Sequence, residues 1–183
     1  MTRFLASLLL LTLASPWAAR AEVDLGNELL AASHFKVLQG KRIGLITNPS
    51  GVNRHLDATV DVLRAAAGVR LAALFGPEHG IYGDVPAGDK VDNRVDTRTG
   101  LPAYSLYGKT HKPTPEMLHG LEALVYDLQD TGCRSYTFIG TMGMAMEACG
   151  EAGIEFIVLD RPDPAGRGTD RGPDAGGSIP VTG

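Results

Sequence analysis

Four short apolar segments alternate with segments of helical pattern, and this alternation constrains the possible folds more than any other feature of the chain. The apolar segments cover residues 42–47, 71–75, 121–126 and 154–159. Near-continuous apolar runs of this length are typical of strands covered on both faces, as they are in parallel sheets. We therefore expect these four segments to be strands of one buried sheet.

The segments between these strands carry the spacing of helices. Apolar residues of 56–67 recur at near-helical intervals, and residues 140–152 are rich in Met and Ala. Strand, helix and strand in this order imply right-handed crossovers and an open α/β sheet. Residues 103–107 are expected to add a further short strand. The predicted fold class is thus α/β, an open parallel sheet with flanking helices.

Polar residues follow each of the four apolar segments. In open parallel sheets the ligand crevice lies outside the carboxyl ends of the strands, so these residues predict a binding site at that edge. Asp, Asn and Thr also commonly open helices, and each group alone is consistent with a cap or a turn. In chain order the groups are Thr47, Asn48 and Pro49; Glu78 and His79; Asp127, Gln129 and Asp130; and Asp160 and Arg161.

The first 21 residues have the pattern of a secretory signal peptide. Arg3 gives a positive start, residues 4–13 are apolar, and Ala19-Arg20-Ala21 fits an A-x-A cleavage site. The apolar stretch is shorter than the roughly 20 residues that a membrane span needs, and a retained N-terminal anchor is the alternative. We therefore expect cleavage after Ala21, a location in the periplasm or outside the cell, and no stable membrane insertion.

Charge and motif spacing exclude several classes of function. Lys and Arg number 17 against 21 Asp and Glu, a net charge of −4 at pH 7. No basic stripe or Lys/Arg cluster exists, which argues against a nucleic-acid partner. A Gly-x-Gly-x-x-Gly fingerprint is absent after the first strand, and no close Cys/His pairing has zinc spacing. We expect no nucleotide cofactor and no metal.

The two cysteines, Cys133 and Cys149, leave two arrangements open. Export would permit a disulfide between them, but spacing alone does not say whether their Cα atoms approach within bonding range. Of the two arrangements, we expect two largely buried thiols.

A series of short motifs resembles the exo-β-N-acetylmuramidase family, formerly a domain-of-unknown-function family and now known as peptidoglycan-recycling glycosidases. The motifs run in the family's order from about residue 38 to residue 164. They are GLITNPSG at 44–51, FGPEHG at 75–80, GD at 83–84, TGLP at 99–102, YSLYG at 104–108, KPT at 112–114, DLQDTGCRSYT at 127–137 and LDRP at 159–162. Each motif alone is weak, and the set together is highly specific.

This resemblance implies a fold, a substrate and a catalytic residue. It implies a Rossmann-like N-terminal domain, here residues 22–161, whose cleft is closed by a second, C-terminal domain. It also implies release of N-acetylmuramic acid from the non-reducing end of peptidoglycan fragments, so that the partners are peptidoglycan-derived muramyl sugars. Glu78 matches the carboxylate that the family favours as catalytic.

The chemistry of glycoside cleavage assigns expected roles to the polar residues. The reaction needs an acid for the leaving oxygen and a second group that activates water or stabilises the oxocarbenium-like state. Glu78 is the candidate acid, and His79 is expected to orient it, contact the lactyl carboxylate or share the proton transfer. Asp130 and Asp127 are candidates for the second carboxylate, unless the substrate's own acetamido group replaces it.

Further residues are expected to bind the sugar. Arg161 and Arg134 suit the muramic carboxylate because a guanidinium binds such groups bidentately, and Tyr107 and Tyr136 suit the sugar ring. Structural alternatives are an Arg134–Asp130 pair, an Arg161 pair with Asp160 or Asp127, a core position for Tyr136, and a purely structural charge at Glu78. The complete set of expected binding residues is Asn48, Tyr107, Asp127, Gln129, Arg134, Tyr136 and Arg161.

The end of the chain departs from the family pattern. Residues 162–183 are rich in Gly and Pro, which predicts a loop or disordered tail and no helix to cover the fourth strand. The domain is therefore expected to stop before the family's second domain, as a fragment or a shortened relative. The alternative function is a non-catalytic domain that binds cell-wall sugars.

Overall fold

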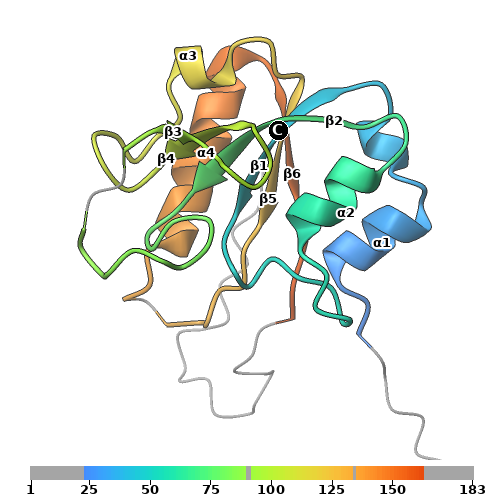
Figure 1. The fold of residues 1–183 in the computed structure, drawn as a ribbon, viewed down its shortest axis with the longest axis horizontal. Coiled ribbons are helices and arrows are strands. Elements are labelled where there is room, and N and C mark those ends of the chain that lie inside the picture. The colour runs from blue at the N-terminus through green and yellow to red at the C-terminus, as the bar shows by residue number, and fades with distance from the viewer. Residues whose placement is uncertain (1–22, 90–91, 134, 163–183) are drawn as a thin grey trace, which may run out of the picture.

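A six-stranded sheet forms the centre of the computed structural model, which describes residues 23–89, 92–133 and 135–162 (Figure 1). The strand order is β3-β4-β2-β1-β5-β6. The predicted α/β fold class is confirmed, and the expected strands all form. Their bounds are β1 Arg42–Thr47, β2 Arg70–Gly76, β3 Arg94–Val95, β4 Pro102–Ser105, β5 Ala123–Asp127 and β6 Glu155–Val158.

The strand pairing is parallel except at one edge. β1 pairs in parallel with β2 and β5, β2 with β4, and β5 with β6, whereas β3 runs antiparallel to β4. The antiparallel β3 was not expected, because it has only two residues and both are exposed. All five residues of β5 are buried, as expected for a central strand covered on both faces.

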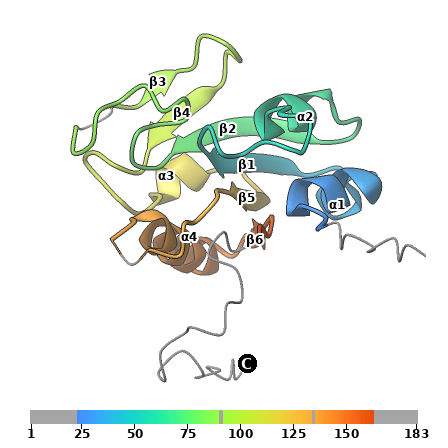
Figure 2. The ribbon, with the colours of Figure 1, turned by 90° about the horizontal axis from the view of Figure 1, so that it is seen from below.

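Helices cover both faces of the sheet (Figure 2). The side chains of α1 and α2 pack with Ile43, Leu45 and Leu74 in one core. Those of α3 and α4 pack with Ile46 and Phe75 in a second core on the opposite face. The helix bounds are α1 Gly26–Ala32, α2 Thr59–Ala65, α3 Pro115–Leu118 and α4 Phe138–Ala152, and η1 at Lys36–Leu38 is a 3₁₀ turn.

The predicted helices are present with shifted ends. The segment predicted at 56–67 forms a helix only at Thr59–Ala65. Leu56 is 79% exposed with φ of 66°, so it belongs to the turn before the helix. The predicted 140–152 helix begins two residues earlier, at Phe138. The seven-residue α1 and the four-residue α3 were not predicted from the sequence.

The start of α1 lies against the end of β6. The Gly26 amide donates to the Asp160 carbonyl at 2.8 Å. A Cβ at residue 26 would lie 2.5 Å from the carbonyl carbon of Leu159, so only glycine fits this close approach of two backbones. α1 is thereby fixed beside the carboxyl edge of the sheet.

The two cysteines differ in environment, and neither forms a disulfide. Cys149 is buried in the α4 core, as expected. Cys133 is exposed, so the expectation of two largely buried thiols is wrong for this residue. Its exposure follows from its position on the loop between β5 and α4, where no apolar layer covers it.

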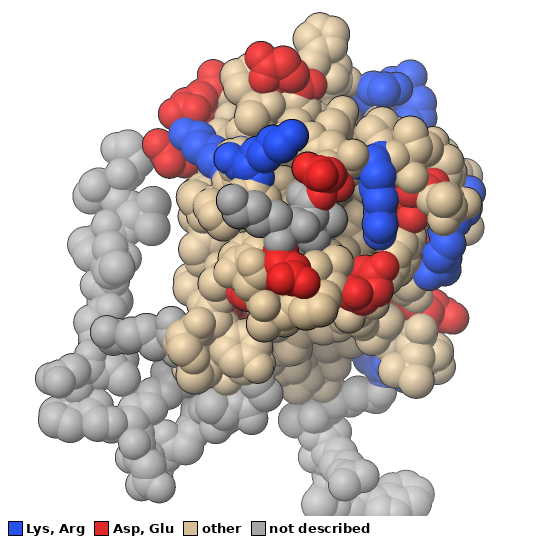
Figure 3. Space-filling view, turned by 60° about the vertical axis from the view of Figure 1, so that its left-hand side comes forward, with Lys and Arg blue, Asp and Glu red and all other residues tan. Residues whose placement is uncertain are grey.

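Charged side chains of both signs share the surface. On the face shown in Figure 3, Lys and Arg stand among Asp and Glu and form no continuous basic stripe. Lys112, for example, lies 3.2 Å from Glu147 and 2.8 Å from Glu151. Within the described ranges, no helix is long and apolar enough to cross a membrane. The signal peptide expected at 1–21 and the tail expected at 162–183 lie, apart from Pro162, outside the described residues.

Candidate active site

The ends of β2 and β4 and the start of α4 bring residues together around Glu78. Glu78 follows β2, Tyr107 follows β4, and Thr137 stands directly before α4. The Thr137 hydroxyl donates to Glu78 Oε2 at 2.8 Å. A hydrogen bond to Glu78 and the negative charge of that carboxylate raise the pKa of Tyr107. The half-buried Glu78 carboxylate thus accepts from the Thr137 hydroxyl and lies near the Tyr107 hydroxyl.

His79 has a strained backbone and a defined ring orientation. Its φ is 69°, in the left-handed region that non-glycine residues rarely occupy, and Gly80 follows with φ of 76°. The ring Nδ1 lies 3.0 Å from the Val85 carbonyl, and the Val85 amide donates back to the His79 carbonyl at 3.4 Å. Because a carbonyl only accepts, Nδ1 is the donor in this contact, and Nε2 takes no part in it. Strain of this kind clusters at functional sites.

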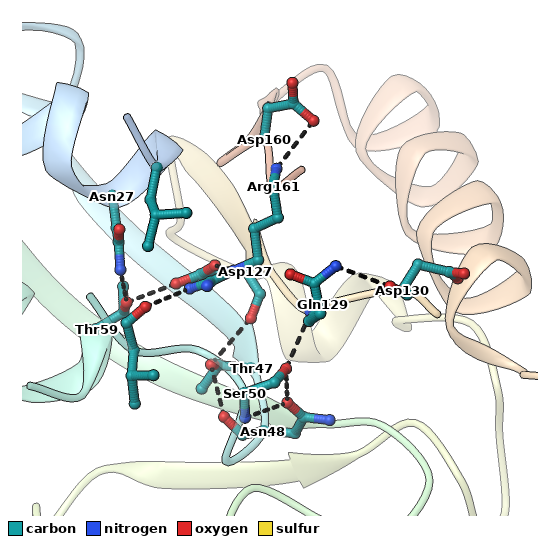
Figure 4. Close-up of polar contacts among 12 residues, drawn as sticks. Asn27, Thr47, Asn48, Ser50, Thr59, Asp127, Gln129, Asp130, Asp160 and Arg161 are labelled. Carbon is teal, nitrogen blue, oxygen red and sulfur yellow. Dashed lines mark hydrogen bonds and ion pairs between the residues drawn. The ribbon is translucent and has the colours of Figure 1, made fainter. Parts of the chain in front are cut away.

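Asn48 and Gln129 join the loop after β1 to the loop after β5 (Figure 4). Asn48 Oδ1 accepts from the Ser50 amide at 2.9 Å and from the Ser50 hydroxyl at 2.5 Å. Ser50 Oγ accepts in turn from the backbone amide of Gln129 at 2.9 Å. The Gln129 side chain donates to the carbonyls of Asp130 and Pro162 at 2.8 and 3.0 Å. These bonds fix the loops that border the carboxyl edge.

Asp130 lies in a separate part of this edge. Its Oδ1 accepts from the Gly132 amide at 2.7 Å, which stabilises the turn after β5. A groove of about 290 Å³ between β5, β6 and α4 is lined by Asp130, Gln129 and Arg161 but not by Glu78. The two carboxylates expected to act together therefore border different parts of the edge.

Asp127 and Arg161 form a buried ion pair. Arg161 Nε lies 2.6 Å from Asp127 Oδ1, and the side chains are 7% and 0% exposed. The Thr59 hydroxyl donates to Asp127 Oδ2 at 2.5 Å, and Asn27 donates to Thr59 at 3.0 Å (Figure 4). Arg161 Nη2 also donates to the Val52 carbonyl at 2.9 Å. The Arg161–Asp127 pair considered as a structural alternative is thus present, and the substrate contacts of both residues stay a prediction.

The loop between β5 and α4 carries the remaining expected residues. Tyr136 is 46% exposed and meets Phe138 edge-on at 5.8 Å between ring centroids, so it is not a core residue. Arg134 lies outside the described residues. Cys133 Sγ lies 3.1 Å from Ser135 Oγ. Across the part of the chain that the structure describes, no three His, Cys, Asp or Glu side chains gather as they would around a metal ion.

Three small hydroxyl residues of the site were not predicted from the sequence. Thr137, Ser50 and Thr59 each bond a residue that had been singled out. Thr137 ends one of the quoted motifs, and a Thr immediately before a helix is normally interpreted as a cap. Its contact with a residue 59 positions earlier has no local signal.

The family of the chain follows from comparison with known proteins. Residues 43–176 match the family model described as "Exo-beta-N-acetylmuramidase NamZ, N-terminal". The chain belongs to this NamZ family. The peptidoglycan beta-N-acetylmuramidase NamZ of Bacillus subtilis (strain 168) is 54% identical over 156 residues, which is 85% of this chain and 38% of that protein. The chain therefore spans about two fifths of the length of this NamZ relative.

Two crystal structures from Bacteroides fragilis NCTC 9343 share the fold of this NamZ-family chain. Both are described as DUF1343 family proteins. One is 59% identical with a TM-score of 0.70, and the match covers 77% of this chain and 35% of that chain. The other is 32% identical with a TM-score of 0.64, covering 79% and 36%. The resemblance to the exo-β-N-acetylmuramidase family is thereby confirmed, for the N-terminal part of the family's length.

Proposed function

We propose that the protein containing this chain hydrolyses the glycosidic bond of N-acetylmuramic acid at the non-reducing end of peptidoglycan fragments. The observation that carries this proposal is the Glu78 carboxylate, held by hydroxyl groups beyond the end of β2. The relative that is 54% identical is itself a peptidoglycan β-N-acetylmuramidase. A carboxylate at the carboxyl edge of an open sheet is where such a fold places ligand chemistry.

Glu78 is proposed to donate a proton to the glycosidic oxygen as the glycosidic bond breaks, and water completes the hydrolysis. Glu78 is half-buried, and the Thr137 hydroxyl donates a hydrogen bond to it. His79 is proposed to assist through Nε2, since Nδ1 is occupied by Val85. Asp130 is the proposed second carboxylate if substrate bridges the edge, and the substrate's acetamido group takes that role otherwise. Glycoside hydrolysis by two carboxyl groups needs no cofactor and no metal.

Further residues are proposed to bind the sugar. Tyr107 and the exposed Tyr136 offer aromatic rings, and Asn48 and Gln129 offer amides at the same edge. Arg134 is the proposed partner of the lactyl carboxylate, because Arg161 is already paired with Asp127. Export through the signal peptide would place the reaction in the periplasm or outside the cell, in cell-wall turnover.

The identity of the sugar at the non-reducing end of a cleaved disaccharide tests this proposal. The intact protein is incubated with two disaccharides, one with N-acetylmuramic acid and one with N-acetylglucosamine at the non-reducing end. Release of free N-acetylmuramic acid from the first disaccharide alone is expected. Release from the second alone would contradict the proposal, and binding of the first without any release would favour the sugar-binding alternative.

A further inference from the structure

The Thr137 side chain does not cap the helix that it precedes. Thr137 stands at the N-cap position of α4, yet its side chain makes no capping hydrogen bond. A Thr at this position normally accepts from an amide of the first turn. The Thr137 hydroxyl instead donates a hydrogen bond to Glu78 Oε2 at 2.8 Å. The local stabilisation of the helix is thus forgone for a contact with a distant loop.

The position of Thr137 is fixed by its neighbours. The Tyr126 hydroxyl donates to the Phe138 carbonyl at 2.9 Å in a buried bond, and burial raises the pKa of Tyr126, so it stays a donor. Phe138 itself is buried in the core with α4. The β-branched Thr137 side chain has restricted χ1 freedom. Its hydroxyl is therefore held in place before any ligand arrives.

A hydroxyl group suits a carboxyl group that changes protonation state. It donates to the ionised carboxylate, and it accepts from the carboxylic acid by rotation of its own proton. The same contact thus persists through both halves of an acid–base cycle.

We propose that Thr137 is the positioning residue of the site, whose hydroxyl holds the Glu78 carboxyl group in its reactive place at the expense of capping α4. The catalytic part of this inference rests on the proposed function. The part about the position of Glu78 does not rest on the proposed function, because the pKa of Tyr107 depends on the nearby Glu78 carboxylate and can be measured without substrate. A hydrogen bond to Glu78 raises the pKa of Tyr107, which also meets His111 edge-on at 5.2 Å between ring centroids.

The first experiment follows the phenol of Tyr107 by NMR in protein labelled with ¹³C at the Tyr ζ carbon. Glu78→Gln removes the carboxylate, so the pKa of Tyr107 measured in this variant is the reference value without the Glu78 contact. Thr137→Val keeps the shape of the side chain and is expected to lower the pKa of Tyr107 toward the Glu78→Gln value. Thr137→Ser keeps the hydroxyl and is expected to leave it near the wild-type value. An unchanged Tyr107 titration in Thr137→Val would overturn the proposal.

The second experiment separates kcat from KM in the intact protein with a muramyl disaccharide. Thr137→Val is expected to lower kcat roughly 10- to 100-fold with KM within about twofold, as for a lost hydrogen bond to a charged group. Thr137→Ser should recover most of kcat, and Thr137→Ala replaces the Val variant if that variant does not fold. Wild-type kcat in a folded Thr137→Val would also overturn the proposal. If wild-type protein releases no muramic acid, the proposed function fails, while the Tyr107 titration still decides whether Thr137 holds Glu78.

Discussion

Arg161 and Asp127 bond to each other at 2.6 Å, with side chains 7% and 0% exposed. The pair joins the segment after β6 to the last residue of β5. A charge taken out of water costs several kcal/mol, which a well-bonded partner offsets. Thr59 and the Val52 carbonyl complete the bonds of the two charged groups. A buried network of hydrogen bonds therefore joins the end of β5 to the segment after β6 at the carboxyl edge.

Removal of one partner from this pair should destabilise the protein strongly. Arg161→Met leaves the Asp127 carboxylate buried without its cation, and we expect a loss of about 3–5 kcal/mol in the free energy of unfolding. Chemical denaturation measures this value. Arg70→Met is the matched control, because the Arg70 side chain is 67% exposed and its change should cost less than about 1 kcal/mol. Equal losses in the two variants would contradict the assignment.

Two glycine substitutions should change stability in opposite directions. Gly26→Ala forces a methyl group into the backbone of Leu159 and Asp160, and a loss of about 1–3 kcal/mol is expected. Gly140 is exposed on α4, and a Cβ there would meet nothing within 4 Å. Gly140→Ala should therefore raise the free energy of unfolding by about 0.5–1 kcal/mol through helix propensity. Thermal unfolding of both variants provides the comparison. A tolerated Gly26→Ala would show that α1 does not lie against β6 this closely.

The two cysteines should differ in their reactivity with pH. Hydrogen bonds from the side chain and backbone of Ser135 lower the pKa of the exposed Cys133, so its thiolate forms at lower pH. Burial raises the pKa of Cys149 to about 11, which keeps this thiol protonated through neutral pH. Alkylation followed by mass spectrometry should modify Cys133 first at every pH up to about 9.

Ser135→Ala supplies the control for this difference. Without the Ser135 hydroxyl, the pKa of Cys133 rises toward its usual value, and the alkylation profile should move to higher pH. The Cys149 profile should not move. Equal alkylation rates for the two cysteines in folded wild-type protein would refute the described environments.

The sequence predicted the sheet well because its evidence is local. Each buried strand is a continuous apolar run, and β5 shows this most clearly, with every residue buried. The two-residue β3 and the four-residue α3 have no comparable pattern, since pairing and capping by neighbours stabilise them. Those short elements could not be predicted from periodicity.

The sequence indicated candidate residues of the site but not the side-chain contacts between them. Arg161 had two chemically reasonable partners, and only its burial beside Asp127 distinguishes a structural pair from a substrate contact. Thr137 carries the signal of a helix cap, while its actual bond reaches Glu78 across 59 residues. Contacts of this kind depend on how the strand ends meet in space, which no short motif encodes.

Substitution of Glu78 tests the central claim most directly. Glu78→Gln keeps the size of the side chain but removes the exchangeable carboxyl proton. The matched control is Glu147→Gln, which changes a carboxylate that is 63% exposed and paired with Lys112 on the surface. Release of N-acetylmuramic acid from a muramyl disaccharide is measured with the intact protein. We predict a loss of at least about 100-fold in kcat for Glu78→Gln with unchanged unfolding temperature, and wild-type activity for Glu147→Gln. Full activity in a folded Glu78→Gln variant would contradict the account.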